Sequence, residues 1–298
     1  MAKFIISVDT SADLFKSFME KNKIHYLVMK RVVDGKELSE VYNSDKDFDN
    51  FYEELKKGAL PTTVAVNSFE AKEHFEKILK SEKEGDIIHL PLSRGLSVTY
   101  DNTKAAAEEI NATLKGRKVH VVDSISVTGI AEILVHRLIE LRDKGVSAAE
   151  AIKKIMHLTE HLQSYVVVSD LFHLKRGGRI SGFKAAIGSL LGIKPVIVVN
   201  HEGRLVINNK PKGLGNAIKY VLAQMKELGE KVRPDFTTGN IYMIYTSKSE
   251  LNDALTEAIK NAYPKATIVV TRIGPIVGTH VGGGASAVVF EGAPRLTK

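Results

Sequence analysis

The sequence has 298 residues, 44% hydrophobic and 26% charged, which is typical of a globular protein with two domains. No apolar run approaches the roughly 18 residues that span a bilayer, and the N-terminus does not resemble a signal peptide, so we expect a cytoplasmic protein. The absence of cysteine excludes disulfides and thiolate metal sites. The net charge of +7 favours anionic partners, but the scattered basic residues and the lack of Trp argue against nucleic acid.

Short β-branched runs alternate with helical patterns in the first half of the chain. Residues 3–8, 87–92 and 118–122 are predicted to be buried strands. The intervening helices begin with recognisable caps, Asn67 followed by Glu70 and Ser147 followed by Glu150. Strands that alternate with helices predict βαβ units and a largely parallel sheet.

Hydroxyl-rich turns follow each of these predicted strands. They occupy residues 9–11, 93–100 and 123–126, and a fourth polar loop lies at residues 61–63. Ser, Thr and Asp are also the preferred residues at helix N-caps, so each turn alone has a structural explanation. Ligands of parallel sheets bind beyond the carboxyl ends of the strands, however. Together the turns are consistent with a polar rim that receives an anionic head group.

The second half of the chain departs from the βαβ rhythm. A hairpin is predicted from residues 196–199 and 204–207, turned by residues 200–203. This pattern predicts an N-terminal parallel-sheet, three-layer α/β domain over residues 1–162 and a C-terminal mixed-sheet α/β domain over residues 163–298. The further elements expected here are strands at 165–169, 241–245 and 267–271, a helix at 213–229 and a helix capped at Ser247.

Several catalytic and cofactor motifs are absent. The segment from His157 to His161 has the spacing H-x-x-E-H, but an exposed helix produces this by chance and no third ligand is evident, so we expect no metal site. No P-loop occurs, the Gly282–Gly284 run lacks a Rossmann context, and no G-x-S-x-G elbow precedes a helix. We therefore expect no nucleotide cofactor and no serine hydrolase.

Two glycine-rich segments are the best candidates for function. Residues 273–284 are predicted to form an uncharged loop in which His280 and exposed glycine amides could hold a carboxylate without a formal counter-charge. Arg176 and Arg179 flank two glycines, and this segment is either a solvated turn or an oxyanion contact. Residues 185–191 are apolar and could line a lipid tunnel or belong to an ordinary core.

The chain resembles the DegV family of bacterial fatty-acid-binding proteins across nearly its full length. The resemblance rests on six ordered motifs, namely residues 9–14, 97–100, 122–124, 175–180, 193–195 and 278–280. It implies a long-chain fatty acid in a tunnel or cleft between the two domains, with no other cofactor. It further implies an ATP-using kinase subunit as partner, which phosphorylates the carboxylate to an acyl phosphate for phospholipid synthesis, so that this chain itself is a non-catalytic carrier.

The same resemblance assigns the carboxylate-binding residues. They are Thr62, Thr63, Ser97 and His280, with Gly278 and Thr279 beside the histidine, whereas Arg179 and Lys212 would lie at the mouth or contact the kinase. The chain departs from the family pattern at Val64, at Val98 in place of glycine, and at Lys212 in place of arginine. The alternative hypotheses are a self-contained phosphotransferase or hydrolase acting on an acyl substrate, and an adaptor that binds an anionic membrane surface transiently.

Overall fold

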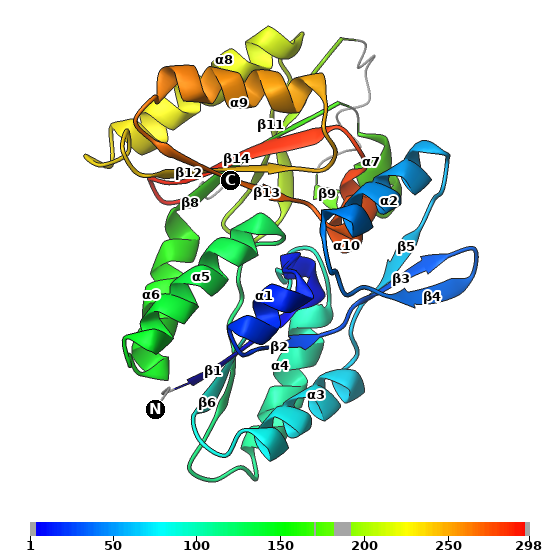
Figure 1. Ribbon diagram of the computed structural model, residues 1–298, viewed down its shortest axis with the longest axis vertical. Coiled ribbons are helices and arrows are strands. Elements are labelled where there is room, and N and C mark those ends of the chain that lie inside the picture. Colours follow the sequence, from blue (N-terminus) through cyan, green and yellow to red (C-terminus); the bar gives the residue numbers. More distant parts are fainter. Residues whose placement is uncertain (1–3, 170, 182–191, 296–298) are drawn as a thin grey trace. The chain divides into compact units, whose positions relative to one another are not determined.

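The computed structural model describes residues 4–169, 171–181 and 192–295, which form two compact units (Figure 1). The first unit consists of Met1–Asp47 and Pro61–Thr159, and the second of Phe48–Leu60 and Glu160–Lys298. The chain therefore passes between the units three times, and a short N-terminal segment belongs to the C-terminal unit. Within the described residues, no helix is both long and apolar enough to cross a membrane.

The first unit is built on a parallel sheet in the order β2-β1-β6-β7. The strands are β1 (Phe4–Asp9), β2 (Ile24–Leu27), β6 (Asp86–Leu90) and β7 (Val119–Val121). The predicted strands at residues 3–8, 87–92 and 118–122 are thus confirmed, with ends shifted by one or two residues. Because side chains alternate along a strand, Ile6 and Val8 face one side of the sheet while Ser7 faces the other.

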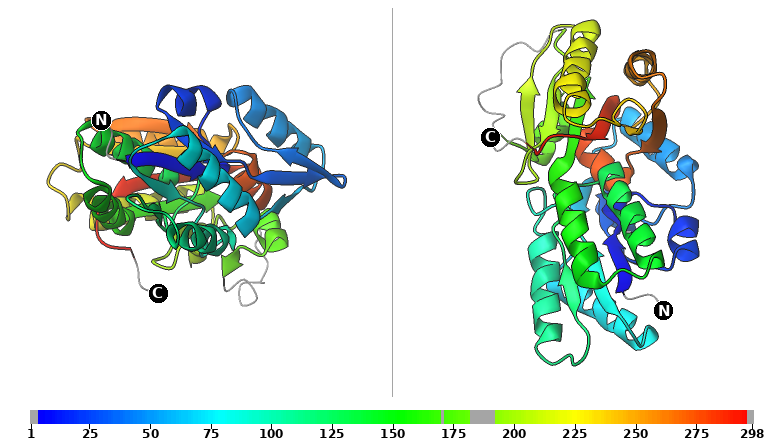
Figure 2. Two further views of the ribbon diagram at one scale, coloured as in Figure 1. Left: turned by 90° about the horizontal axis from the view of Figure 1, so that it is seen from below. Right: turned by 90° about the vertical axis from the view of Figure 1, so that its left-hand side faces the viewer.

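Helices cover both faces of this sheet, as the βαβ pattern predicts. They are α1 (Lys16–Lys21), α3 (Ser68–Ser81), α4 (Thr99–Asn111), α5 (Gly129–Asp143) and α6 (Ala148–His161), with a 3₁₀ turn η1 at Thr10–Ala12. Helices α3 and α4 pack side by side (Figure 2), and Phe18 of α1 packs on His136 of α5. The predicted capping box at Asn67 and Glu70 is present, and Ser147 Oγ accepts a hydrogen bond from the Glu150 amide at 3.4 Å.

A small antiparallel sheet in the order β4-β3-β5 completes the first unit. Its strands are β3 (Lys30–Val33), β4 (Lys36–Ser39) and β5 (Thr62–Val64). Asp34 and Gly35 both have positive φ, 50° and 75°, which is the geometry of the tight turn that joins two such strands. The following helix, α2 (Asp45–Lys56), begins in the first unit and continues into the second.

The second unit contains a mixed sheet in the order β13-β12-β14-β8-β10-β11-β9. The strands are β8 (Leu162–Val168), β9 (Ile180–Ser181), β10 (Val196–Val199), β11 (Leu205–Asn209), β12 (Asn240–Tyr245), β13 (Thr267–Arg272) and β14 (Ala285–Glu291). The predicted hairpin is confirmed as the antiparallel pair β10 and β11. The chain as a whole therefore has the predicted fold class, with one parallel-sheet unit and one mixed-sheet unit.

Two helices cover one face of the mixed sheet and close its core (Figure 1). These are α8 (Leu214–Met225), which continues into a π-helical turn η3 (Lys226–Glu230), and α9 (Glu250–Ala262). Val221 and Leu255 are fully buried beneath them. The predicted cap at Ser247 is wrong by two residues, because the hydroxyl that accepts from the amide of Asn252 in the first turn of α9 belongs to Ser249.

Residues 273–284 do not form a loop, which corrects the sequence prediction. They contain the short helix α10 (Pro275–Val281), which lies beside α7 (Phe172–Gly177). Pro275 is the first helical residue, where its fixed φ and missing N–H are tolerated. Gly278 is required for close packing, since a Cβ there would lie 2.6 Å from atoms of both Phe51 and Tyr52. The glycines that suggested a loop thus permit a tightly packed helix.

Candidate functional site

Asp9 joins the ends of β1 and β6 in the first unit. Its buried carboxylate accepts hydrogen bonds from the amide of Ser11 at 3.0 Å, from the hydroxyl of Ser11, and from the amide of Leu92 at 2.7 Å. Burial raises the pKa of Asp9, and these three hydrogen bonds oppose that effect. Because its oxygen atoms are used in this way, Asp9 is a structural clamp at the rim rather than a group available to a ligand.

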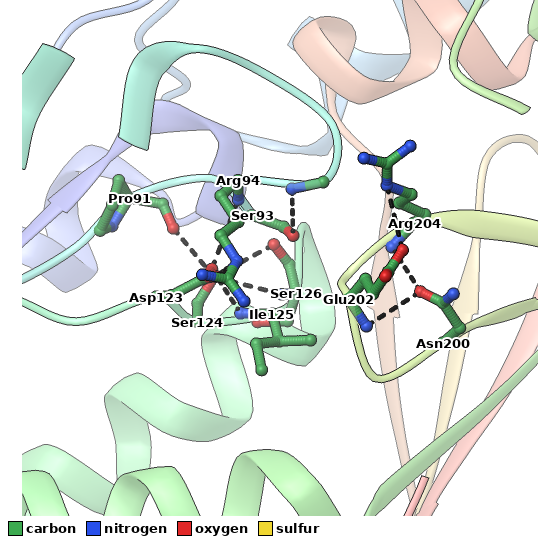
Figure 3. A network of polar contacts seen from close by, with 11 residues as sticks. Pro91, Ser93, Arg94, Asp123, Ser124, Ile125, Ser126, Asn200, Glu202 and Arg204 are labelled. Carbon is green, nitrogen blue, oxygen red and sulfur yellow. Dashed lines mark hydrogen bonds and ion pairs between the residues drawn. The ribbon is translucent and has the colours of Figure 1, made fainter. Parts of the chain in front are cut away.

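The turn after β7 is held by a similar network of polar contacts (Figure 3). Ser124 Oγ donates to the carbonyl of Pro91 at 2.8 Å and accepts from the amide of Ser126 at 3.2 Å. Asp123 accepts from the amide of Ile125 at 3.0 Å and forms an ion pair with Arg94 at 3.1 Å. The polar side chains of the turns at 9–11 and 123–126 therefore form hydrogen bonds with nearby backbone groups. This agrees with the structural explanation of these turns rather than with a ligand site.

Figure 3 also includes the hairpin turn of the second unit, which has its own internal network. The side chain of Asn200 accepts from the amides of Glu202 at 3.1 Å and Arg204 at 2.9 Å. Arg204 and Glu202 form an ion pair at 3.3 Å. These contacts fix the β10–β11 turn and involve none of the predicted site residues.

Ser97 belongs to a different group of hydroxyls, at the start of α4. Its Oγ donates to Thr99 Oγ1 at 3.0 Å and accepts from the Thr99 amide at 3.2 Å. Thr99 Oγ1 also accepts from the amide of Val66 at 3.2 Å, and Asn102 donates to the carbonyl of Val66 at 2.8 Å. The segment that directly follows β5 is thereby fastened to the beginning of α4.

The predicted residues Thr62 and Thr63 lie on β5, paired with Val32 and Arg31 of β3. Thr62 is exposed and Thr63 is half-buried. Because Val66 anchors the end of this strand to α4, the first unit brings Thr62, Thr63 and Ser97 onto neighbouring segments.

In the second unit, α10 carries Gly278, Thr279 and His280. The Gly278 amide donates to Gly274 at 2.8 Å, and the Thr279 hydroxyl donates to Pro275 at 2.8 Å, so both groups are engaged within the helix. The expectation of exposed glycine amides is therefore wrong for Gly278, since an amide inside a helical ladder has no hydrogen left for a ligand. Gly278 and Thr279 are thus engaged within α10 and serve its packing.

His280 lies among positively charged neighbours. Burial, together with the charges of Arg179 and Arg176, lowers the pKa of His280 to about 4. Its imidazole is therefore neutral near pH 7 and has one N–H to donate. Contrary to the expectation of a site without a counter-charge, an anion beside His280 would experience two guanidinium groups, which favour it electrostatically.

Arg176 is placed by three segments of the second unit. It extends from α7 and donates to the carbonyls of Leu60 at 3.3 Å and Thr279 at 3.4 Å. Leu60 precedes the Pro61-Thr62-Thr63 sequence directly in the chain. Arg176 therefore links α7, α10 and the segment that leads into β5, a role that the motif at residues 175–180 did not reveal.

The other two basic residues of the prediction lie in different settings. Arg179 is exposed, precedes β9, and donates to the carbonyl of Gly177 at 2.5 Å. Lys212 is also exposed and lies at an isolated bridge to Ile193. The charge of Arg179 contributes to the lowered pKa of His280, whereas no described contact links Lys212 to that histidine. The apolar residues 185–191 lie outside the described residues.

The sequence analysis missed two contributions in the second unit, one from a pair of aromatic residues on α2 and one from a glycine on α7. Phe51 and Tyr52 of α2 pack against Gly278, and the Tyr52 hydroxyl donates to the carbonyl of Ile273 at 2.7 Å. Gly177 contacts the imidazole of His280. The two glycines between Arg176 and Arg179 indicated a close backbone contact, which Gly177 makes. Nothing in the sequence of α2 indicated that this helix packs against α10. In the described part of the chain, no His, Asp and Glu side chains gather in threes as a metal would require.

Comparison with known proteins gives a consistent result. A family model described as "Uncharacterised protein, DegV family" matches residues 3–293. A DegV domain-containing protein of Clostridium perfringens is 34% identical over 292 residues, which cover 98% of each chain. The crystal structure of a fatty acid binding DegV family protein from Streptococcus agalactiae covers 98% of this chain and 99% of its own, with a TM-score of 0.83 and 26% identity.

A second solved structure agrees with this result. DegV of Bacillus subtilis, described as a fatty acid binding protein, has a TM-score of 0.79 and 26% identity, covering 97% of this chain and 99% of its own. The family model and the relatives extend over both units, including all the predicted site residues. The chain belongs to the DegV family.

Proposed function

We propose that this protein is a non-catalytic carrier that binds one long-chain fatty acid and presents its carboxylate to a separate, ATP-using kinase subunit. The observation that carries the proposal is the match along both units to DegV proteins described as fatty acid binding. The chemistry of His280, a neutral imidazole under the influence of two arginines, is suited to a carboxylate. No other cofactor is needed for this function.

The carboxylate is proposed to be held by His280 together with Ser97, Thr62 and Thr63. A carboxylate that leaves water must be met by several donors, or its burial is costly. Three hydroxyls and one imidazole supply up to four such bonds, and the charges of Arg176 and Arg179 add a long-range attraction. The acyl chain contributes roughly 0.8 kcal/mol for each buried methylene, so a long chain supplies most of the affinity.

In this proposal, another protein carries out the phosphorylation of the fatty acid. The sequence contains no P-loop, and Asp9, a buried carboxylate at the rim of the first sheet, is engaged by backbone amides. Arg179, exposed and two residues beyond Gly177, is the group proposed to meet phosphoryl oxygens or the kinase subunit. Lys212 is proposed as a second contact with the kinase, and a transient anionic membrane surface as the place where the ligand is exchanged.

Native mass spectrometry of the purified protein tests the carrier proposal. Wild-type protein is expected to carry one fatty acid, and His280→Ala and Ser97→Ala should each weaken its retention on the order of tenfold, as loss of a hydrogen bond to a charged group predicts. His157→Ala, at an exposed position on α6, is the matched control and should retain wild-type occupancy. Unchanged occupancy in both site variants would refute the assignment of these residues.

The role as a subunit is tested by turnover. Protein loaded with fatty acid should form no acyl phosphate with ATP and Mg²⁺ alone, and should form it when a fatty acid kinase subunit is added. Acyl phosphate formed or hydrolysed by this chain by itself would instead support the self-contained enzyme and overturn the carrier proposal.

A further inference from the structure

The imidazole of His280 rests directly on the backbone of Gly177, the last residue of α7. A Cβ at position 177 would lie 2.4 Å from Nδ1 of His280, 3.3 Å from Cγ and 3.5 Å from Cβ. Contacts shorter than 3.0 Å essentially never occur for real Cβ atoms. Any side chain at this position must therefore displace the ring or separate the two helices.

Separation of the helices is opposed by other close contacts of α10. On one side, Gly278 packs against Phe51 and Tyr52, where a Cβ would lie 2.6 Å from both the Phe51 ring and the Tyr52 hydroxyl. At its end, Gly282 packs against His173 of α7, with a Cβ distance of 2.3 Å. Arg176 also donates to the carbonyl of Thr279. Because the backbone of α10 is fixed on both sides, a side chain at position 177 must move the imidazole ring instead.

The contact also determines which nitrogen of His280 faces a ligand. Nδ1 is buried against Gly177, whereas the residue as a whole is only half-buried. Nε2 lies on the side of the ring away from this contact, and it is the nitrogen that we assign to a ligand. A neutral imidazole donates from only one nitrogen, so the orientation of the ring decides whether that proton reaches the ligand.

We propose that Gly177 is a positioning residue that sets the orientation of the His280 imidazole and presents its Nε2–H to the bound carboxylate. The part of this inference that concerns the carboxylate rests on the proposed function. The part that concerns ring orientation does not, and it is measurable in protein without ligand. The two consecutive glycines of the Arg-Gly-Gly-Arg segment then have different tasks, since Gly178 adopts a φ of +66° and has no atom within 4 Å of its Cβ position.

The test compares Gly177→Ala with Gly178→Ala by ¹H–¹⁵N NMR of the histidine rings, with the His280 signals assigned by their loss in His280→Ala. Gly177→Ala should shift the His280 ring resonances, while Gly178→Ala, which strains the backbone without touching the ring, should leave them in place. Unmoved His280 resonances in folded Gly177→Ala protein would overturn the proposal. This arm is valid whether or not the protein binds fatty acid.

A double-mutant cycle separates positioning from a general structural role. In the wild-type background, Gly177→Ala should weaken binding of a fluorescent C16 or C18 fatty acid about tenfold, the effect of losing one hydrogen bond to a charged group. In the His280→Ala background the same change should alter binding less than about twofold, because the displaced ring is absent. An equal loss in both backgrounds would show that Gly177 does not act through His280.

Thermal unfolding covers the case in which Gly177→Ala folds poorly. The clash is relieved in the Gly177→Ala/His280→Ala protein, which should therefore unfold at a higher temperature than Gly177→Ala alone. A double variant as unstable as the single variant would overturn the proposed contact. If wild-type protein binds no fatty acid, the proposed function fails, while the NMR and unfolding results still decide the role of Gly177.

Discussion

In the first unit, Ser7 Oγ lies 2.8 Å from His74 Nε2 and 2.9 Å from His89 Nδ1, whereas in the second unit His280 lies between a glycine and two arginines. Burial is the largest cause of the lowered pKa of His74, His89 and His280. The imidazoles beside Ser7 have a hydroxyl partner within the core of their own unit. Nearby positive charges lower the pKa of His74 further, from His25 and Lys77, and that of His280, from Arg179 and Arg176. The two guanidinium groups beside His280 also attract an anion.

A lowered pKa therefore does not by itself identify a functional histidine. Ser7 and His89 are paired in register on adjacent strands, and His74 reaches them from α3, so their network ties a helix to the sheet. A serine donates one hydrogen bond and accepts others, and it can therefore bridge two neutral imidazoles. The hydroxyl that His74 and His89 share gives these two rings a structural role within the first unit, whatever their pKa.

The largest expected effect is on stability, from Ser7→Ala. The change leaves two buried imidazole nitrogens without their partner and should lower the free energy of unfolding by about 2–3 kcal/mol. Ser39→Ala, at an exposed strand position, is the control and should change it by less than about 0.5 kcal/mol. Urea unfolding gives both values. Fatty acid occupancy should remain at the wild-type level, and a loss of occupancy in folded Ser7→Ala protein would contradict the structural role.

Acid should destabilise the protein through these same histidines. The pKa of His74 is about 3 in the folded state, against 6.5 for an ordinary histidine, so only the unfolded chain takes up the proton as the pH falls below 6.5. The resulting stabilisation is complete above pH 6.5 and is lost between pH 6.5 and 3, by about 1.4 kcal/mol per pH unit for each histidine. Urea unfolding at pH 7.5 and pH 5 should thus differ by about 2 kcal/mol for each histidine of this kind.

His74→Gln sharpens the acid experiment, because the amide can still meet Ser7 but does not titrate. This variant should lose less stability between pH 7.5 and pH 5 than wild-type protein. His157→Gln, on the exposed side of α6, should behave as wild type. Equal stability of the wild type at both pH values would show that the buried histidines are not neutral in the folded protein.

The smallest expected effect comes from Arg179→Gln. Removal of this charge should raise the pKa of His280, because Arg179 is one of the causes that lower it. Arg179 is exposed and its charge is partly screened, so fatty acid binding should weaken only about threefold. An NMR titration of the His280 ring measures the first effect. Lys175→Gln, on the nearby helix α7, should leave the His280 pKa unchanged, and an equal shift in both variants would mean that net charge alone is responsible.

The alternation of strands and helices was sufficient to predict the parallel sheet, and the β10–β11 hairpin was predicted to within two residues. These elements follow from local patterns, namely β-branched runs, capping residues and turn residues. The small sheet β4-β3-β5 and the short helix α10 were not predicted. Glycine indicates backbone freedom, but Gly278 is present because two aromatic rings from α2 approach it, and no local pattern reports a contact 227 positions away, from Phe51 to Gly278.

The candidate site was predictable only in part for the same reason. His280 was a candidate from its glycine-rich segment, Ser97 and the two threonines were assigned through the family resemblance, and the structure gives His280 its arginine neighbours. Asp9 and Ser124 resembled ligand-binding residues in the sequence but serve the backbone, because a cap and a ligand site use the same side chains. The contributions of Arg176 and Gly177 depend on how α7 lies against α10, which is a tertiary contact.

The placement of residues 48–60 in the second unit has a consequence for synthesis of the chain. Phe48, Phe51, Tyr52 and Leu55 are buried, and the segment that Phe51 and Tyr52 pack against, around Gly278, is translated more than 200 residues later. At about 5–20 residues per second, this apolar face remains uncovered for roughly 10 to 45 seconds on the ribosome. The first unit can mature early, whereas the partner of α2 arrives almost at the end of translation. The apolar face of α2 thus depends on a partner that is made near the end of translation, and residues 160–298 alone lack a segment of the second unit.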